Sequence, residues 1–541
     1  MTRQILIATD ARSRVQGSRH QHGGRLPRHA PCLTVVLAIA GLTFAAPEAH
    51  SQSITGTAFW YGSAGANWNT AGNWGPTTGG TTSSVPGNGA VLRWFGSSTN
   101  NRTSTNDMVG LSAGGMSFQS ASGTYTLNGS NTLTLTGGIS GVAPTSVTIN
   151  MPLEINTNTL TVEGGNDALT INGSISETGG SRGLNAQSGT MTFTGNNSFS
   201  GGMILGVGSN ATIKVNALAN IGSSQPLGSG TTITFGHSSG NGTIIYTGTA
   251  DASTDKRFQV GRSAAASTGA GGVSNNGTGV VTWTGSQALA TSNTSSLVFT
   301  LGGSNTNNNT WQSAIANNSA TGLIGLTKAG TGKWILSGSN TYDGLTTVSA
   351  GTLLVNGNQS GAIGAVSVAA GAILGGTGTL GAASAAITGT VAPGLSDALG
   401  TLSVAGSAMN FSSGGSLLAQ LNSNPAVFTS DLLSLTGAGS LTLGGSSILD
   451  LVGPASFTTS GTYTLATFAS GSLTGQFTTV RYNGATFANP TNPNAVNSGG
   501  TLVYNGDSIQ FVVVPEPATL VLAGLGVGLA GLMLKHRRRP L

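Results

Sequence analysis

The sequence predicts an all-β fold in which short strands coil into a stack, and three observations lead to this prediction. Glycine contributes 87 of 541 residues and charged residues only 6%, whereas ordinary proteins have about 7% glycine. Residues 124–140, 160–176 and 400–411 alternate apolar and polar side chains between Gly, Asn or Ser, as strands joined by tight turns do. This pattern fills residues 54–512, too long for one sandwich core, so a β-solenoid is favoured.

Each residue type has an expected place in such a coil. Leu, Val and Ile would point inward and stack from turn to turn, while Thr and Ser would face water. Glycine would occupy turns that need a positive φ, and asparagine would tolerate the left-handed conformation and form ladders through hydrogen bonds. We expect turns of about twenty residues, with neighbouring strands ~4.8 Å apart.

Charge and reactive side chains exclude several classes of function. Half of the 20 Lys and Arg residues lie in the first 29 or the last seven positions, which leaves the middle nearly neutral. Because nucleic-acid binding needs clustered basic residues, no nucleic-acid partner is predicted. The single Cys32 precedes the first apolar run, and His237, alone in the middle of the chain, is expected on a surface turn. The sequence therefore predicts no cofactor, no metal and no disulfide.

Residues 1–51 are predicted to be a secretory signal peptide with a long cationic region. The apolar stretch 31–46 follows six arginines, and Ala49-His50-Ser51 offers small residues for cleavage. A retained N-terminal anchor is the alternative, which the short apolar stretch disfavours. We expect export.

Residues 52–100 form a tryptophan-rich segment that is predicted to cap the start of the stack. An open solenoid end exposes edge strands and core, so large apolar residues are needed there. The alternative is a carbohydrate site, in which exposed rings stack on sugars. The segment contains Phe59-Trp60, Trp68, Asn73-Trp74, Pro86-Gly87 and Ala90-Val91-Leu92. This pattern resembles the opening segment that often precedes the repeats of β-solenoid repeat proteins.

Residues 325–357 are the most regular unit of the predicted solenoid, which spans residues 101–512. The unit contains Gly325-Leu326-Thr327-Lys328, Gly330, Gly332, Leu336-Ser337-Gly338, Asn340-Thr341-Tyr342, Gly344, Thr346-Thr347-Val348, Gly351-Thr352-Leu353 and Val355. It resembles the autotransporter-associated β-strand repeat, which implies a right-handed parallel β-helix. A weaker copy covers 183–215, where Gly195–Gly201 stands in the place of Gly338–Gly344 and the motif's Lys, Lys328 in the strong copy, has no counterpart.

Residues 513–541 combine three features: Pro515-Glu516-Pro517, the apolar stretch 518–534 and the basic residues Lys535, Arg537, Arg538 and Arg539. Seventeen residues at ~1.5 Å each can just cross a bilayer as a helix. Basic residues stay on the cytoplasmic side, so the chain would be held in the inner membrane with its body outside. The layout resembles the PEP-CTERM sorting signal, which implies that an exosortase-type membrane enzyme recognises and processes it. A plain anchor is the alternative.

An enzyme remains an alternative, because parallel β-helices also carry polysaccharide lyases and hydrolases. Glycoside hydrolysis needs two carboxylates that face each other across the bond. The closest acid pairs are Glu163 with Asp167 and Asp251 with Asp255, and both pairs are expected in solvated turns. No EF-hand, phosphate loop or nucleophile elbow is present.

The sequence thus predicts a non-catalytic, exported structural protein of a Gram-negative surface or biofilm matrix. Its neutral Thr/Asn/Ser faces suit exopolysaccharide, where many weak contacts add up. An autotransporter adhesin is one rival, although the chain ends in an apolar stretch rather than the strands of a C-terminal barrel. A β-helical polysaccharide lyase or hydrolase is the other.

Overall fold

The computed structural model describes residues 53–513 with short gaps, all within the unit His50–Leu541. The predicted signal peptide, the Pro515-Glu516-Pro517 motif, the 518–534 stretch and the basic tail lie outside the described residues. Among the described residues, no helix is both long and apolar enough to cross a bilayer. The gaps are 80–83, 96–101, 120–122, 142–145, 166–168, 263–266, 395–397, 407, 423, 425–426, 456, 458, 488–494 and 497–499.

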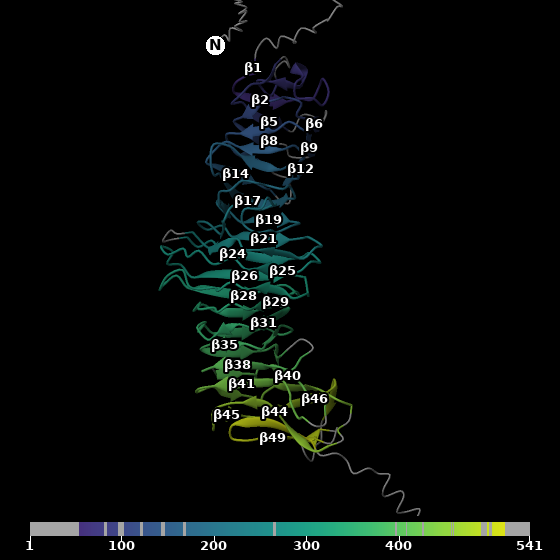
Figure 1. Cartoon of the computed structure of the whole chain (residues 1–541), viewed down its shortest axis with the longest axis vertical. Coiled ribbons are helices and arrows are strands. Elements are labelled where there is room, and N and C mark those ends of the chain that lie inside the picture. The colour runs from purple at the N-terminus through teal and green to yellow at the C-terminus, as the bar shows by residue number, and fades with distance from the viewer. Residues whose placement is uncertain are drawn as a thin grey trace, which may run out of the picture. The chain divides into compact units, whose positions relative to one another are not determined.

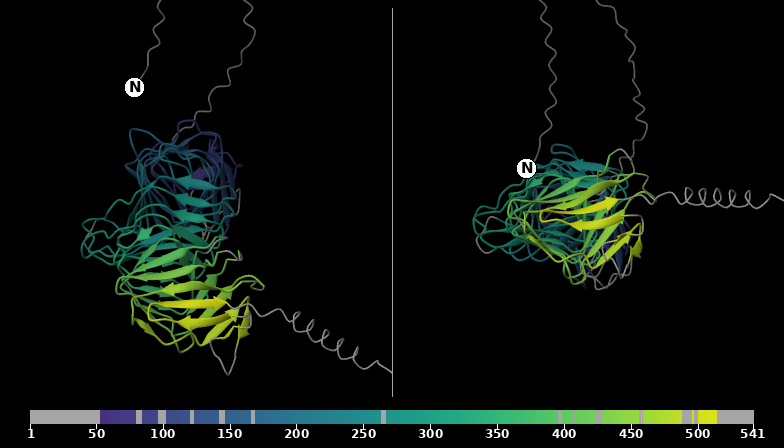
Figure 2. Two further views of the ribbon diagram at one scale, coloured as in Figure 1. Left: turned by 60° about the horizontal axis from the view of Figure 1, so that its bottom comes forward. Right: turned by 90° about the horizontal axis from the view of Figure 1, so that it is seen from below.

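The described residues form parallel strands that stack turn upon turn (Figure 1). Their sheets contain 25, 11, 8, 4 and 2 strands, and the helical content of the described part is one 3-10 turn, Ala71–Asn73. Viewed from below, the successive turns lie one behind another (Figure 2). The predicted β-solenoid is therefore confirmed, while its right-handed sense stays a prediction.

Three walls recur in chain order, and each strand pairs in parallel with the same wall of the next turn. The first, which we call the long wall, runs through nearly the whole stack. Its strands are β6 (Thr103–Thr105), β9 (Thr124–Asn128), β12 (Ser146–Ile149), β15 (Leu169–Ile171), β17 (Gly183–Phe193), β19 (Ala211–Val215), β21 (Gly242–Tyr246), β24 (Gly271–Asn275), β26 (Leu297–Gly303), β28 (Ile324–Lys328), β30 (Thr346–Val348), β33 (Val366–Val368), β36 (Ser384–Ile387), β39 (Ala408–Asn410), β42 (Ser440–Thr442) and β45 (Leu473–Thr474).

The second wall follows the long wall in each turn and consists of two sheets. Its strands are β7 (Ser112–Ala113), β10 (Leu133–Leu135), β13 (Leu153–Ile155), β16 (Ile175–Glu177), β22 (Ala252–Thr254), β25 (Val281–Trp283), β27 (Asn309–Trp311), β29 (Lys333–Leu336), β31 (Thr352–Val355), β34 (Ile373–Gly376), β37 (Thr390–Pro393), β40 (Ser416–Gln420), β43 (Ile448–Val452) and β46 (Thr479–Tyr482).

The third wall closes each turn, and β17 crosses from it into the long wall. Its other strands are β2 (Thr57–Trp60), β5 (Val91–Phe95), β8 (Gly115–Gln119), β11 (Ile139–Ser140), β14 (Thr159–Glu163), β18 (Met203–Leu205), β20 (Thr232–Phe235), β23 (Arg257–Val260), β32 (Asn358–Gln359), β35 (Thr379–Gly381), β38 (Thr401–Ala405), β41 (Leu432–Thr436) and β44 (Gly461–Thr467).

Antiparallel strands occur at both ends of the stack, where an edge would otherwise be open. At the start, β3 (Trp74–Gly75) pairs with β2, and β1 (Ser53–Ile54) pairs in parallel with β4 (Val85–Pro86). At the other end, β50 (Ser508–Val513) pairs antiparallel with β44 and β49 (Gly500–Tyr504). Two short antiparallel strands complete that end, β47 (Ala485–Phe487) and β48 (Ala495–Val496).

The core consists of inward side chains that repeat in register from turn to turn. Leu127, Ile149, Ile171, Phe193 and Val215 occupy one such column, and each is fully buried. Strand residues alternate between the two faces, so this column requires the alternating sequence observed. Positive φ outside glycine occurs, within the described part, only at Ser238 and Asn483, so the expectation of left-handed asparagines was largely wrong.

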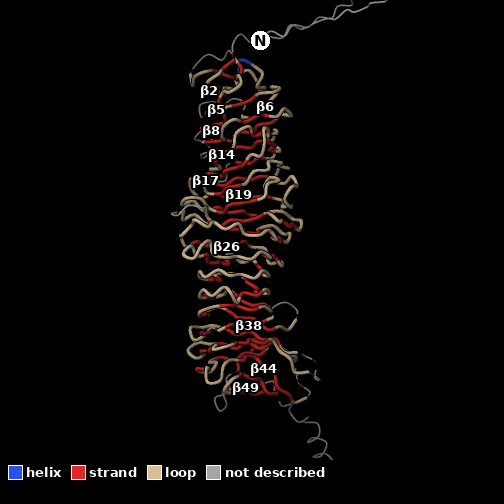
Figure 3. Tube along the Cα trace, turned by 60° about the vertical axis from the view of Figure 1, so that its left-hand side comes forward, coloured by secondary structure: helices blue, strands red, loops and turns tan. Residues whose placement is uncertain are grey.

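The length of the turns varies more than the sequence suggested. Asn150 and Asn172, one turn apart, are separated by 22 residues, close to the predicted twenty. Asn210 and Asn241 are separated by 31 residues, because a long loop, residues 216–231, connects β19 to β20. Figure 3 shows the loops that leave the stack beside β19. A uniform turn of about twenty residues was therefore wrong for the middle of the stack.

Candidate functional site

Four tryptophans at the start of the stack pack against one another. Trp60, Trp68, Trp74 and Trp94 are each 0% exposed. The ring centroids of Trp60 and Trp74 are 4.9 Å apart, and Trp94 stacks on Phe118 at 4.8 Å. Stacking on sugars requires exposed rings, so the carbohydrate alternative is wrong for these residues. Buried rings at this end of the stack agree with the predicted cap. The boundaries of the cap segment, residues 52–100, stay a prediction.

The two repeat copies place corresponding asparagines in the same role. Asn197 Oδ1 accepts a hydrogen bond from the backbone N–H of Ile175 at 2.8 Å, and Asn340 Oδ1 accepts one from Ile315 at 2.7 Å. Both asparagines are at most 1% exposed. Each amide therefore satisfies a buried backbone group of the preceding turn, which gives the repeated Asn a structural function.

Lys328 of the stronger repeat is buried, a role that the sequence did not reveal. Its Nζ donates to the carbonyls of Ala329, Gly330 and Ala350 at 2.7–3.0 Å. Burial lowers its pKa to about 8. Lys256, also buried, donates to the carbonyl of Gly230, and burial lowers its pKa to about 8 despite nearby Asp255.

Three of the four acids proposed for an alternative catalytic site accept hydrogen bonds from the backbone. Glu163 Oε2 accepts from the N–H of Gly141 at 2.9 Å, and Asp167 lies outside the described residues. Asp251 Oδ1 accepts from Val280 at 2.8 Å, while Asp255 Oδ1 accepts from Ile221 at 2.6 Å. Glu163, Asp251 and Asp255 thus each join two neighbouring turns.

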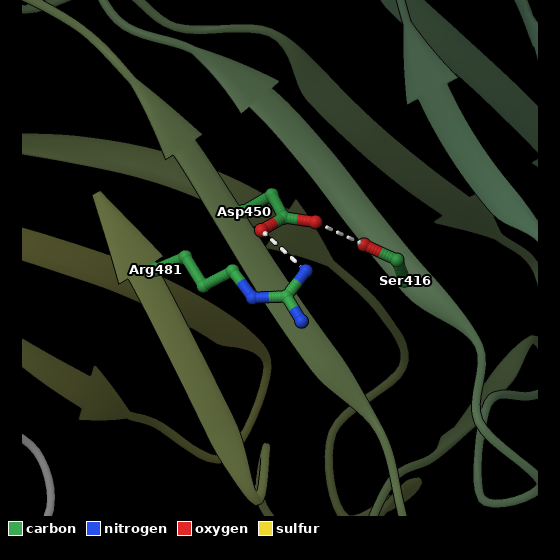
Figure 4. A network of polar contacts seen from close by, with 3 residues as sticks. All are labelled: Ser416, Asp450 and Arg481. Carbon is green, nitrogen blue, oxygen red and sulfur yellow. Dashed lines mark hydrogen bonds and ion pairs between the residues drawn. The ribbon is translucent and has the colours of Figure 1, made fainter. Parts of the chain in front are cut away.

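Outside these pairs, Asp450 joins three strands of the second wall (Figure 4). Its carboxylate accepts a hydrogen bond from Ser416 Oγ at 2.7 Å on β40 and pairs with Arg481 at 3.5 Å on β46. Both charged side chains are partly exposed, at 25% and 39%, so the pair contributes at most about 1 kcal/mol. This contact links successive turns.

His237 lies in the turn after β20, as the sequence predicted. Its Nδ1 is 3.0 Å from Ser238 Oγ, and burial, together with Arg262, lowers its pKa. Within the described ranges, no group of three or more His, Cys, Asp or Glu residues could hold a metal ion. The contact of His237 with Ser238 joins two adjacent residues of one turn.

A cavity of about 460 Å³ opens on the outer face of the long wall, at β21, β24 and β26. None of its lining residues is charged, and they include Thr243, Gly272, Ser274, Val298 and Thr300. A Cβ on Gly272 would stand 1.9 Å from the carbonyl oxygen of Thr300, so this position must be glycine. Thr243 and Thr300 pair with Gly272 from the turns on either side and both line the cavity, so this turn is without the side chain that its neighbours carry.

Val513, the last residue of β50, is fully buried. Pro515, the first residue of the predicted sorting tripeptide, follows two positions later. The tripeptide thus directly follows the strand that closes the stack.

Comparison with known proteins finds matches at both repeat copies and at the C-terminal motif. The family described as Passenger-associated-transport-repeat matches residues 186–208 and 326–355. The PEP-CTERM protein-sorting motif matches residues 513–539. The Adhesin BmaC autotransporter of Brucella suis biovar 1 (strain 1330) is 30% identical over 243 residues, which is 44% of this chain and 6% of the adhesin. No solved structure matches the chain significantly.

These findings define an exported surface protein with a repetitive β-solenoid body. More particularly, the chain carries a PEP-CTERM sorting motif and two passenger-associated-transport repeats. Both resemblances drawn from the sequence are confirmed, at nearly the predicted residues.

Proposed function

We propose that this chain is a non-catalytic structural protein of the cell surface or extracellular matrix that is sorted by an exosortase-type membrane enzyme. The observation that carries this proposal is the position of the sorting motif, which begins at Val513, the last residue of the closing strand β50. Cleavage beside Pro515, Glu516 and Pro517 would release the whole stack without cutting a strand. Before processing, residues 518–534 hold the chain in the inner membrane, with Lys535 and Arg537–Arg539 on the cytoplasmic side.

A role without catalysis is supported by how the carboxylates are used. Glu163, Asp251 and Asp255 each accept backbone hydrogen bonds, and Asp450 pairs with Arg481. The outer face of the long wall carries mainly uncharged polar side chains, with Lys214 among them on β19, and this suits association with exopolysaccharide. Its many weak contacts would act together along the stack.

The intact masses of the protein from cells and from medium test the proposal, because they locate both termini. We expect a start near Gln52 and an end near the tripeptide. Glu516→Ala should leave the C-terminus at Leu541, whereas Glu163→Ala, within the body, should leave processing unchanged. A C-terminus at Leu541 in every fraction of the unaltered protein would show a plain anchor and remove the sorting proposal.

An adhesin is the second candidate, and the similarity to an autotransporter adhesin favours it. Adhesion and matrix association differ in the partner that is bound. Deleting the gene should abolish attachment to host cells if the chain is an adhesin, and should instead loosen the polysaccharide matrix if it is a matrix protein.

A further inference from the structure

Threonines form a column in register on the outer face of the long wall. We call this set the threonine column; successive turns contribute Thr190, Thr212, Thr243, Gly272, Thr300, Thr327 and Thr347. Within the described part of the chain, none of these threonine hydroxyls makes a hydrogen bond. The column therefore offers unpaired hydroxyl groups at every turn except that of Gly272.

Other polar side chains of the same wall behave differently. Asn150 donates to Asn128 at 2.8 Å and accepts from Asn172 at 2.9 Å, so this ladder satisfies its own amides. The threonine hydroxyls can each donate one hydrogen bond and accept others. The threonine hydroxyls keep all of their hydrogen-bonding capacity for a ligand, whereas Asn150 uses one donor and one acceptor within the ladder.

The cavity at Gly272 adds depth to this surface. Thr243 and Thr300 lie on either side of it along the stack, and Val298, which is 47% exposed, lies at its edge. Leu345, two turns further along the same outer face, is 52% exposed. Hydroxyl groups and exposed apolar surface thus alternate across the strands, and no charged residue lines the cavity.

We propose that the threonine column and its cavity bind a neutral, linear, β-linked polysaccharide that runs along the stack, with a group projecting from one sugar seated in the cavity at Gly272. This inference rests on the proposed function and names the surface and the ligand class. Strands of neighbouring turns are ~4.8 Å apart, and an extended β-linked glycan repeats its sugars at a similar interval. Successive hydroxyls would therefore meet successive sugars.

Charge selects the neutral class of glycan. A polyanionic chain would need several Lys or Arg along the column, whereas the described strands that carry it have one basic side chain on this face, Lys214 beside Thr212. The column positions from Thr243 to Thr347 carry hydroxyl groups or glycine. Sugars present hydroxyls as well as apolar C–H faces, which match the threonines and Val298. Each contact is weak, and the repetition of the column makes the binding multivalent.

The test uses the full mature chain with soluble neutral β-1,4-linked glucan, xylan and mannan, and with alginate as an anionic comparison. Affinity electrophoresis measures binding by the unaltered protein, by Thr243→Val with Thr300→Val, and by Ser296→Trp, which fills the cavity from an exposed position. Thr282→Val on β25 is the matched control, in the adjoining wall. Circular dichroism verifies that each variant keeps its strands.

We expect binding to at least one neutral glycan. The paired valines should bind about tenfold more weakly, because two hydrogen-bonding hydroxyl groups are removed. Ser296→Trp should lose a comparable factor, and the control should change by less than about twofold. Equal binding by all variants, binding to alginate alone, or binding to none of the glycans would overturn the inference. The masses of the processed termini would be unaffected by any of these results, so the sorting proposal is judged separately.

Discussion

Two stretches of the same stack differ in the length of their turns and in the side chains that form their core. The narrow turns from β9 to β19 repeat every 22 residues and enclose mainly aliphatic side chains such as Ile149 and Ile171. The wide turns from β21 to β28 advance by about 28 residues and enclose large rings, with Trp283 and Trp311 stacked at 5.2 Å. A longer turn encloses a larger cross-section, and close packing then requires larger side chains. Turn length and core residue type therefore change together.

The two stretches also differ in where they keep polar side chains. The narrow turns hold their asparagine ladder at the surface, whereas the wide turns bury Asn275 and Asn309 completely. Asn309 Oδ1 accepts from the N–H of Val281 at 2.9 Å and from Asn275 Nδ2 at 2.6 Å. Longer loops contain backbone groups without strand partners, and a buried amide satisfies them. The narrow turns already bury one such amide, Asn197, which accepts from the N–H of Ile175. Widening the turn therefore adds to the buried amides as well as enlarging the rings.

The largest effect is expected from removing a ring of the wide turns. Trp311→Ala should lower the free energy of unfolding by about 4 kcal/mol, because it leaves a cavity that rigid walls cannot close. Ile171→Val in the narrow turns should cost only about 1 kcal/mol. Denaturant unfolding measures both, and equal losses would contradict the idea that the wide turns depend on their rings.

A smaller but still large effect is expected at the buried amide. Asn309→Ala should cost about 3 kcal/mol, because it leaves buried backbone and amide groups unpaired. Hydrogen exchange tests this more specifically than global unfolding does, because the Val281 amide loses its acceptor and should exchange faster. Unchanged protection of that amide would show that another group replaces Asn309.

The buried lysines of the wide turns predict a dependence on alkaline pH. Burial lowers the pKa of Lys328 to about 8 from 10.5. Between these values the unfolded chain binds more protons than the folded one, so stability rises with pH. Tyr342, whose pKa burial raises to about 12 from 10.0, reverses the trend above pH 10, because the unfolded tyrosine ionises first.

Unfolding free energies measured from pH 8 to 10 should therefore increase, and Lys328→Met should flatten this rise. Replacing Lys256 as well should flatten it further, since burial also lowers its pKa to about 8. An unchanged slope in the double variant would assign the rise to other groups.

Much of this architecture could be predicted from the sequence, because strand alternation and glycine turns are local signals. The alternation of residues 124–128 became β9, and the two repeats were located by their own residues. The wide turns could not be predicted, because nothing local shows that Trp283 meets Trp311 from another turn. Burial of Lys328 depends likewise on the carbonyl of Ala350 one turn away. The threonine column is visible only once the register aligns residues about thirty positions apart.

The smallest effect is expected from the asparagine ladder of the narrow turns. Asn150→Ala removes hydrogen bonds to Asn128 and Asn172, but all three amides lie near water, which replaces the lost partners. We expect a loss of about 0.5 kcal/mol in unfolding free energy, several times less than for Asn309→Ala. Asn150→Asp keeps the acceptor for Asn172 and loses the donor to Asn128, so it separates the two bonds. A loss at Asn150 as large as that at Asn309 would mean that the ladder, rather than the apolar column beneath it, sets the register of the narrow turns.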